Sequence, residues 1–274
     1  MAPALSNARP AIGPASAPAV PLRRIGPDDL RAALREGYGD FLAKRGDLVF
    51  IGFIYTLVGL AVAVASLGNS LLPFFFPVAA GLSLLGPLAC TGFYELARRR
   101  EAGLESNWWH FFAIVRHPSR GQIALVAGIL IAIFIAWVAA ATIVYQIFLG
   151  DTPPASLGGF LATLFATPEG WAMMIVGNLV GLGFAALVLT ISLVSLPMLI
   201  DRRTDGGTAI AASIRAVRAN PAVTARWGLT VAVLLIVGSI PFFLGLAVVL
   251  PVLGYATWYL YTRLVDRSVL PPAQ

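Results

Sequence analysis

Apolar residues gather in long blocks along the chain, and short polar segments separate the blocks. About 20 apolar residues cross the hydrocarbon core of a bilayer as a helix, where the backbone must satisfy its own hydrogen bonds. The pattern therefore predicts an all-α polytopic membrane helix bundle of six transmembrane helices, arranged as three hairpins. The predicted spans are 48–67, 71–97, 122–149, 171–200, 227–243 and 245–264.

The last apolar block, Trp227–Val265, is too long for one transmembrane helix. At 1.5 Å per residue it would form a helix of about 58 Å, nearly twice the thickness of the hydrocarbon core. Two spans joined by a tight turn near Pro241–Gly245 fit this length. One span followed by an interfacial helix is the alternative.

Basic residues alternate with the predicted spans. All 19 Lys and Arg residues fall before span one, between spans two and three, between spans four and five, or at the C-terminal end. The connections 68–70 and 150–170 and the turn near Pro241 hold none. Since cytoplasmic segments carry the Lys and Arg excess, both termini are predicted to be cytoplasmic. A five-span topology would place Arg263 and Arg267 outside.

Composition agrees with a membrane protein. The chain is 58% hydrophobic and 12% charged, with a net charge of +6, whereas soluble domains carry roughly 25% charged residues. Residues 1–21 are rich in Ala and Pro and predict a disordered cytoplasmic tail, and residues 22–267 predict a single integral membrane domain. The basic residues flank the spans, where anionic headgroups lie, so we expect no nucleic acid partner. The single cysteine, Cys90, excludes an internal disulfide.

Each basic segment contains one amphipathic helix before a predicted hairpin. These helices are Pro27–Lys44, Asn107–His117 and Thr208–Ala219. The unit of amphipathic helix, span, turn and proline-bearing span thus occurs three times, although any hairpin-built protein with Arg flanks would look similar. The helices either lie flat in the headgroup layer or pack under the bundle as a cytoplasmic collar. Trp108 and Trp109 are candidate interfacial anchors.

Arginines near the span ends are the candidate contacts for anionic lipid headgroups or a partner protein. They are Arg98, Arg99, Arg116, Arg202, Arg215 and Arg218. Glu95, the acidic residue nearest to the interior of a span, is expected to pair with Arg98 or Arg99 at helical spacing.

Gly177 and Gly181 form a pair of small residues four apart, with Asn178 between them. Such a pair lets two helices approach closely, so we interpret this site as helix packing rather than a substrate contact. The expected partners are membrane lipids with anionic headgroups, together with a membrane protein partner or a second copy of the chain.

Catalytic patterns are missing from the sequence. No Asp, Glu, Lys, Arg or His falls in the middle of a span, and no nucleophile elbow or phosphate-binding loop is present. His110 and His117 lie two helical turns apart without a further His or Cys ligand, so an interfacial, solvated role is expected. The sequence therefore predicts no catalytic, metal or cofactor-binding residue and no enzyme activity.

Three segments resemble a bacterial family of predicted integral membrane proteins, domain of unknown function 2189. They are Arg24–Leu30, Tyr94–Arg100 and Leu250–Tyr261. The resemblance covers nearly the whole chain after the tail and implies a multi-pass protein of the bacterial inner membrane. The family has no assigned activity to transfer. Two functions stay open: a membrane scaffold or envelope-maintenance and assembly factor with a basic cytoplasmic face, and a carrier or flippase for a small neutral or amphiphilic, lipid-like molecule.

Overall fold

The computed structural model describes residues 20–43, 84–150, 156–241 and 243–273, together with Phe53, Leu57, Leu60, Ala61 and Val78. The predicted span 48–67 and residues 71–83 of the second predicted span therefore lie outside the described residues, apart from these single positions.

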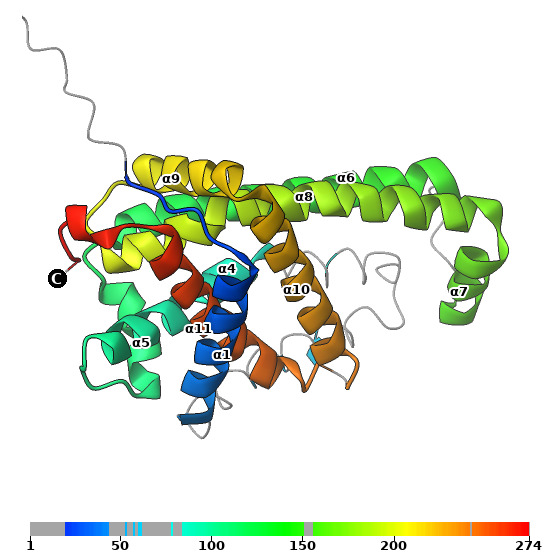
Figure 1. Cartoon of the computed structure of the whole chain (residues 1–274). Coiled ribbons are helices and arrows are strands. Elements are labelled where there is room, and N and C mark those ends of the chain that lie inside the picture. The colour runs from blue at the N-terminus through cyan, green and yellow to red at the C-terminus, as the bar shows by residue number, and fades with distance from the viewer. Residues whose placement is uncertain are drawn as a thin grey trace, which may run out of the picture.

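Helices make up the regular structure of the described ranges (Figure 1). They are α1 (Pro27–Ala43), α4 (Gly86–Ala89), α5 (Thr91–Glu101), η2 (Trp108–Arg116), α6 (Arg120–Leu149), α7 (Leu157–Ala166), α8 (Pro168–Asp201), α9 (Gly206–Ala219), α10 (Pro221–Ser239), α11 (Leu246–Leu264) and η3 (Arg267–Val269).

Helices α6 and α8 form a long hairpin, the arm, which projects from the rest of the protein and carries α7 at its tip (Figure 1). Gly150, with a positive φ of 76°, ends α6. Helix α8 starts at Pro168, and the side chain of Thr167 accepts a hydrogen bond from the Gly170 amide at this start. Phe160 of α7 is buried in a small cluster at the tip.

Among the described residues, three helices are long and apolar enough to cross a membrane: α6, α8 and α10. They coincide with the predicted spans 122–149, 171–200 and 227–243, although α10 begins six residues earlier, at Pro221. The helical class is thereby confirmed, while the count of six spans and the three-hairpin arrangement stay predictions.

Helix α11 matches the predicted sixth span in position but is not among these three helices. Its second half is rich in Tyr, Trp and Thr, and its last turn contains Arg263, which lowers its hydropathy. Most of its residues are buried against α1, α5, α8 and α10.

A tight turn joins α10 to α11, as the length of the apolar block predicts. The backbones of Gly238 and Gly245 touch there: a Cβ on Gly245 would lie 2.7 Å from the Gly238 Cα. Any side chain at Gly245 would force the two helices apart, so this glycine is required for the hairpin.

Helix α1 lies along α11 instead of standing alone on a membrane surface (Figure 1). The two helices meet at Gly37, where an added Cβ would lie 2.6 Å from the Ala256 amide nitrogen. Of the two sequence interpretations of the amphipathic helices, the packed collar therefore describes α1.

The second amphipathic segment is a 3₁₀-helix, η2, whereas the sequence suggested α-helical spacing. Side chains three apart eclipse one another in a 3₁₀-helix. Trp108, Phe111 and Ile114 consequently form one row packed against the core. Trp109, Phe112 and Val115 form a second row, whose side chains are exposed.

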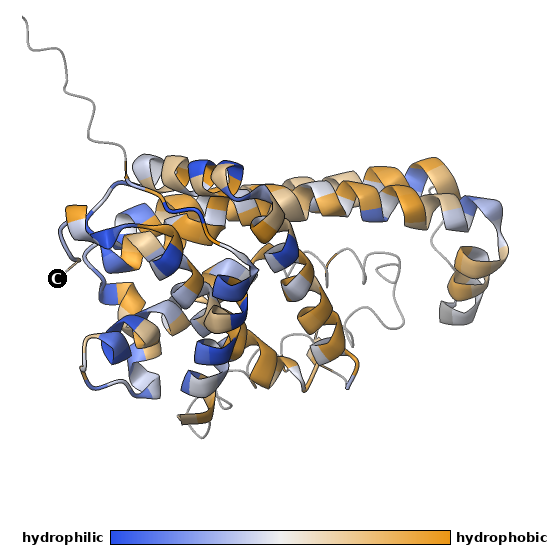
Figure 2. Cartoon of the chain, viewed as in Figure 1, coloured by the Kyte–Doolittle hydropathy of each residue, from blue (hydrophilic) through white to orange (hydrophobic). Residues whose placement is uncertain are grey.

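Apolar and polar residues are concentrated in different parts of the protein (Figure 2). Apolar residues cover the arm and α10, whereas polar residues gather on α1, α5 and the outer side of α9. We call the assembly of α1, α5, η2, α9, α11 and the buried half of α8 the body.

Candidate functional site: a buried ion-pair cluster and an unpaired basic surface

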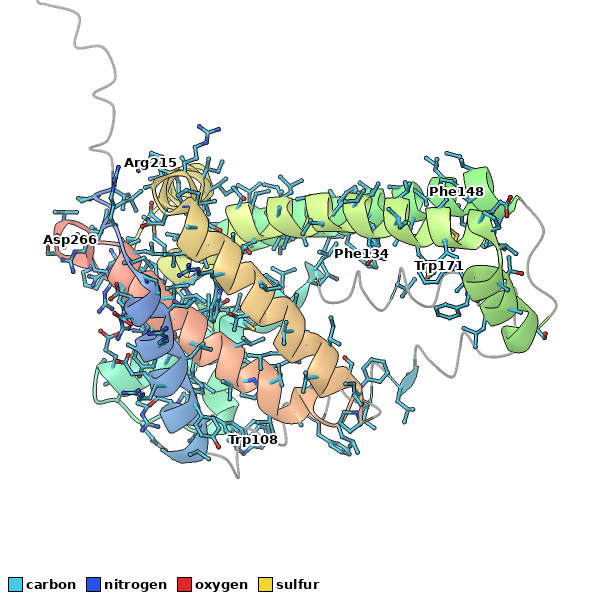
Figure 3. All side chains as sticks on the ribbon, turned by 45° about the vertical axis from the view of Figure 1, so that its right-hand side comes forward. Trp108, Phe134, Phe148, Trp171, Arg215 and Asp266 are labelled. Atoms are coloured by element: carbon cyan, nitrogen blue, oxygen red, sulfur yellow. The ribbon has the colours of Figure 1, made fainter. Side chains whose placement is uncertain are left out.

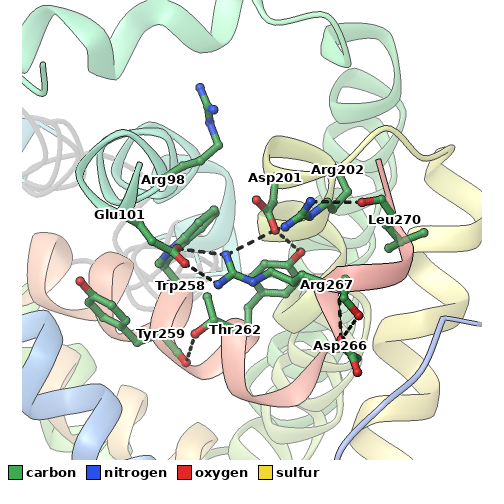
Figure 4. Close-up of polar contacts among 12 residues, drawn as sticks. Arg98, Glu101, Asp201, Arg202, Trp258, Tyr259, Thr262, Asp266, Arg267 and Leu270 are labelled. Carbon is green, nitrogen blue, oxygen red and sulfur yellow. Dashed lines mark hydrogen bonds and ion pairs between the residues drawn. The ribbon is translucent and has the colours of Figure 1, made fainter. Parts of the chain in front are cut away.

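A cluster of charged residues lies where α5, α8, α11 and the C-terminal segment meet (Figure 4). Arg267 donates two hydrogen bonds to the Glu101 carboxylate, and its Nη1 lies 3.7 Å from Asp201 Oδ2. The guanidinium therefore joins α5 to the end of α8. Burial would raise the pKa of Glu101, but the hydrogen bonds and charge of Arg267 outweigh burial and lower it.

Asp201 is the buried carboxylate of this cluster, with 6% of its surface exposed. Its Oδ2 accepts hydrogen bonds from Arg202 Nε at 3.0 Å and from the Tyr261 hydroxyl at 2.8 Å. Trp258 adds a hydrogen bond from its indole nitrogen to Glu101 at 3.0 Å. The cluster therefore connects two aromatic side chains of α11 to two carboxylates on other helices (Figure 4).

A second ion pair joins α1 to α5, and a hydrogen bond beside it joins α1 to α11. Asp40 accepts a 2.6 Å hydrogen bond from the Tyr259 hydroxyl and lies 3.0 Å from Arg100 Nε. Burial raises the pKa of Asp40, and the bond from Tyr259 and the charge of Arg100 only partly oppose this effect. At the surface, Arg263 Nη2 donates to Glu36 at 2.7 Å.

Glu95 is buried and pairs with both predicted partners. Its carboxylate accepts bonds from Arg98 Nε and Nη2, each at 2.8 Å, and from Arg99 Nε at 2.9 Å. The predicted pairing is confirmed. Both guanidinium groups therefore share the single carboxylate of Glu95.

The two ends of the described chain are joined by backbone hydrogen bonds. The amide of Arg23 donates to the Leu264 carbonyl at 2.8 Å, and the amide of Asp266 donates to Pro21 at 3.1 Å. Asn220, between α9 and α10, accepts from the Ile25 amide at 2.9 Å through its side chain. Residues 20–26 and 265–273 therefore lie against the same side of the body.

The predicted lipid contacts divide into two sets. Arg98, Arg99 and Arg202 are half-buried and form ion pairs with Glu95 or Asp201. Arg116, Arg215 and Arg218 have no acidic partner within the described part of the chain, and Arg215 extends away from α9 (Figure 3). The described arginines without an ion pair are Arg24, Arg35, Arg116, Arg120, Arg203, Arg215, Arg218 and Arg226.

His117 is buried, with 7% of its surface exposed, so the predicted solvated role is wrong for this residue. Its Nδ1 accepts a 3.1 Å hydrogen bond from the Ser119 amide, and the ring also hydrogen-bonds the Ile200 backbone. Pro118 holds His117 in an extended conformation, which turns the imidazole toward α8.

The predicted helix-packing site lies in the arm. A Cβ on Gly181 would lie 3.1 Å from the Trp137 ring of α6, whereas Gly177 has an ordinary 3.9 Å contact with Val144. Gly181 therefore makes room for the Trp137 side chain of α6. Asn178 is exposed, and its amide donates to the Met174 carbonyl of its own helix at 2.7 Å, so it does not take part in the α6–α8 contact.

Sequence reasoning missed the partners of Arg267. Glu101 lies 166 residues away in the chain, so no local spacing could reveal the pair. Glu95 differs because its partners are three and four residues away on the same helix. Among the described residues, no group of three or more His, Cys, Asp and Glu side chains is arranged to hold a metal ion.

Comparison with known proteins finds a family similar to part of the chain, and that family has no described activity. No curated protein and no solved structure matches it. Residues 75–201, which cover most of the second predicted span and continue to the end of α8, match the model of a family described as "Predicted integral membrane protein (DUF2189)". The predicted resemblance is thus confirmed over this segment: residues 75–201 match the family of predicted integral membrane proteins of domain of unknown function 2189.

Proposed function

We propose that the protein is a non-enzymatic scaffold of the bacterial inner membrane, acting in envelope maintenance or assembly, with the body and both termini in the cytoplasm. The observation that carries this proposal is the set of hydrogen bonds and ion pairs between the helices of the body. Asp40, Glu101 and Asp201 each join their own helix to α11 or to the C-terminal segment. Such connections favour one fixed arrangement of helices.

A carrier for a neutral or amphiphilic molecule is the alternative. It would have to move its helices relative to one another between two states, and buried ion pairs oppose such motion because separating them leaves charges uncompensated. Asn178, a polar residue within the fourth predicted span, donates a hydrogen bond to its own helix. Within the described residues, this contact gives the carrier no support.

A reversible cross-link between α1 and α11 tests the scaffold. In a C90A background, E36C and R263C replace the two ends of a surface ion pair, and a short bis-methanethiosulfonate reagent joins the two thiols. A scaffold needs no relative motion of these helices, so the cross-linked protein should complement a deletion strain as well as the uncross-linked protein does.

The single variants E36C and R263C, treated with the same reagent, control for thiol modification. Complementation that is lost on cross-linking and regained when a reductant cleaves the reagent would overturn the scaffold and favour the carrier.

A further inference from the structure

The exposure of the side chains of helix α8 changes along its length. From Trp171 to Leu187 its outer side is exposed, with Ile175, Leu179 and Leu182 each more than half exposed, whereas Val188 to Asp201 is buried almost throughout. Helix α6 carries exposed apolar residues along its whole length, including Leu125, Ile135 and Ile147. Apart from Glu169, residues 131–149 and 156–187 carry no charge.

The exposed part of the arm has the length of a bilayer core. From Trp171 to Leu187, α8 rises about 25 Å, against a hydrocarbon thickness of about 30 Å. At the tip, the indole of Trp171 donates to the Phe165 carbonyl at 3.0 Å and both rings are exposed, as is typical of an interfacial aromatic belt. The opposite membrane surface should then lie near Val188, where α8 enters the body.

Helix α9 places its arginines near this second membrane surface, at the level of Val188. Ser213 is fully buried against α8: its hydroxyl donates to the Thr190 carbonyl at 2.7 Å and accepts from the Val194 amide at 3.1 Å. The hydroxyl thus inserts between a backbone donor and acceptor of α8 and fixes α9 against residues 190–194. Arg215 and Arg218 lie beyond Ser213, off the buried stripe of α9.

Helix α10 adds Arg226 at the same level. Two residues later, Gly228 lies against α8, where an added Cβ would be 3.0 Å from Leu189 Cδ2. One turn after Arg226, Leu229 is 66% exposed, so this guanidinium lies at the edge of the apolar surface. Neither α6 nor α10 has an acidic residue in its first turn, so no carboxylate there offsets the positive helix ends.

We infer that Arg215, Arg218 and Arg226 form a binding surface for the phosphates of anionic phospholipids, at the level where α8 and α10 enter the membrane. Charge complementarity selects this ligand, because none of the three arginines has an acidic partner in the described structure. The three arginines lie next to exposed apolar residues, as expected at a membrane surface. This position favours a lipid headgroup as the ligand over a soluble acidic protein. The inference extends the proposed function by naming a ligand for its basic face.

Native mass spectrometry of the full-length protein tests the surface, with phosphatidylglycerol and phosphatidylcholine competing for it. An arginine at a membrane surface contributes about fivefold in preference for anionic lipid. R218Q/R226Q should therefore lose up to about 30-fold of the preference for phosphatidylglycerol, and R218K/R226K should keep it. Added salt should weaken the preference of the wild type.

The matched control is R31Q/R35Q, which removes two exposed arginines from α1. This control should keep the preference. Retained preference in R218Q/R226Q, or an equal loss in R31Q/R35Q, would overturn the inference. If R218Q/R226Q does not fold, the single variants R218Q and R226Q should each show about a fivefold loss. The lipid surface can fail in this assay while the cross-linked protein still complements, so the two proposals fail separately.

Discussion

Single residues in this protein take roles that depend on neighbours distant in the chain. His117 shows this most clearly: local spacing placed it at a solvated surface, and the fold turns it inward against α8. With Nδ1 accepting a bond from Ser119 and the ring donating to the Ile200 carbonyl, the geometry requires the neutral imidazole.

His117 should make the protein less stable in mild acid. Burial lowers its pKa below the ordinary value of 6.5; the charge of Glu95 opposes this shift and that of Arg98 adds to it. The unfolded chain therefore binds a proton at His117 more readily than the folded chain does. The contribution of His117 to the stability of the fold is complete above pH 6.5, the ordinary pKa, and is lost as the pH falls toward the lower pKa of the folded protein.

Thermal unfolding in detergent between about pH 7.5 and about pH 5.5 measures this effect. H117Q can keep a polar contact but cannot titrate, so its unfolding temperature should fall less over this range. Equal pH dependence in both proteins would show that His117 does not carry the effect.

At the scale of elements, the type and position of a helix depend on which of its side-chain rows pack against other helices. The segment of η2 is 3₁₀ because rows three apart suit one buried and one exposed side. Helix α1 is amphipathic as predicted, but its apolar face meets α11 and not a lipid surface. Gly37 makes this contact possible, since it brings the α1 backbone against Ala256.

The contact between α1 and α11 should not tolerate a methyl group. G37A would place its Cβ 2.6 Å from the Ala256 nitrogen, and overpacking of this kind costs about 1–3 kcal/mol. G39A is the matched control on the same helix, with nothing within 4 Å of its Cβ, and it should raise stability by about 0.5–1 kcal/mol. Thermal unfolding should rank G39A above the wild type and G37A below it; equal values for the two variants would contradict the close approach.

At the scale of the whole molecule, an apolar arm and α10 extend from a polar body held together by ion pairs (Figures 1 and 2). Residues 20–26 and 265–273 are joined to each other by backbone hydrogen bonds on one side of that body. We therefore predict that these two segments share one side of the membrane, which requires an even number of crossings between them.

Labelling of single cysteines in intact cells tests this topology. In a C90A background, exposed positions Arg24 and Val269 are changed separately to cysteine. Both should resist a membrane-impermeant maleimide and react only after the membrane is opened. A cysteine at Ser156, beside the tip of the arm, should react in intact cells. Labelling of only one of the two end positions in intact cells would exclude an even number of spans.

The sequence by itself determined the helical membrane class, the apolar segments that became α6, α8, α10 and α11, the turn between the last two, and the pairing of Glu95 with Arg98 and Arg99. These features depend on hydropathy and on neighbours within one helical turn, which a linear pattern records. Only the tertiary structure decided which arginines are free. Arg267 is neutralised by Glu101, 166 residues away, whereas Arg218 has no acidic neighbour among the described residues. Contact between distant segments decides each case, because an ion pair forms only where packing brings the opposite charge within reach.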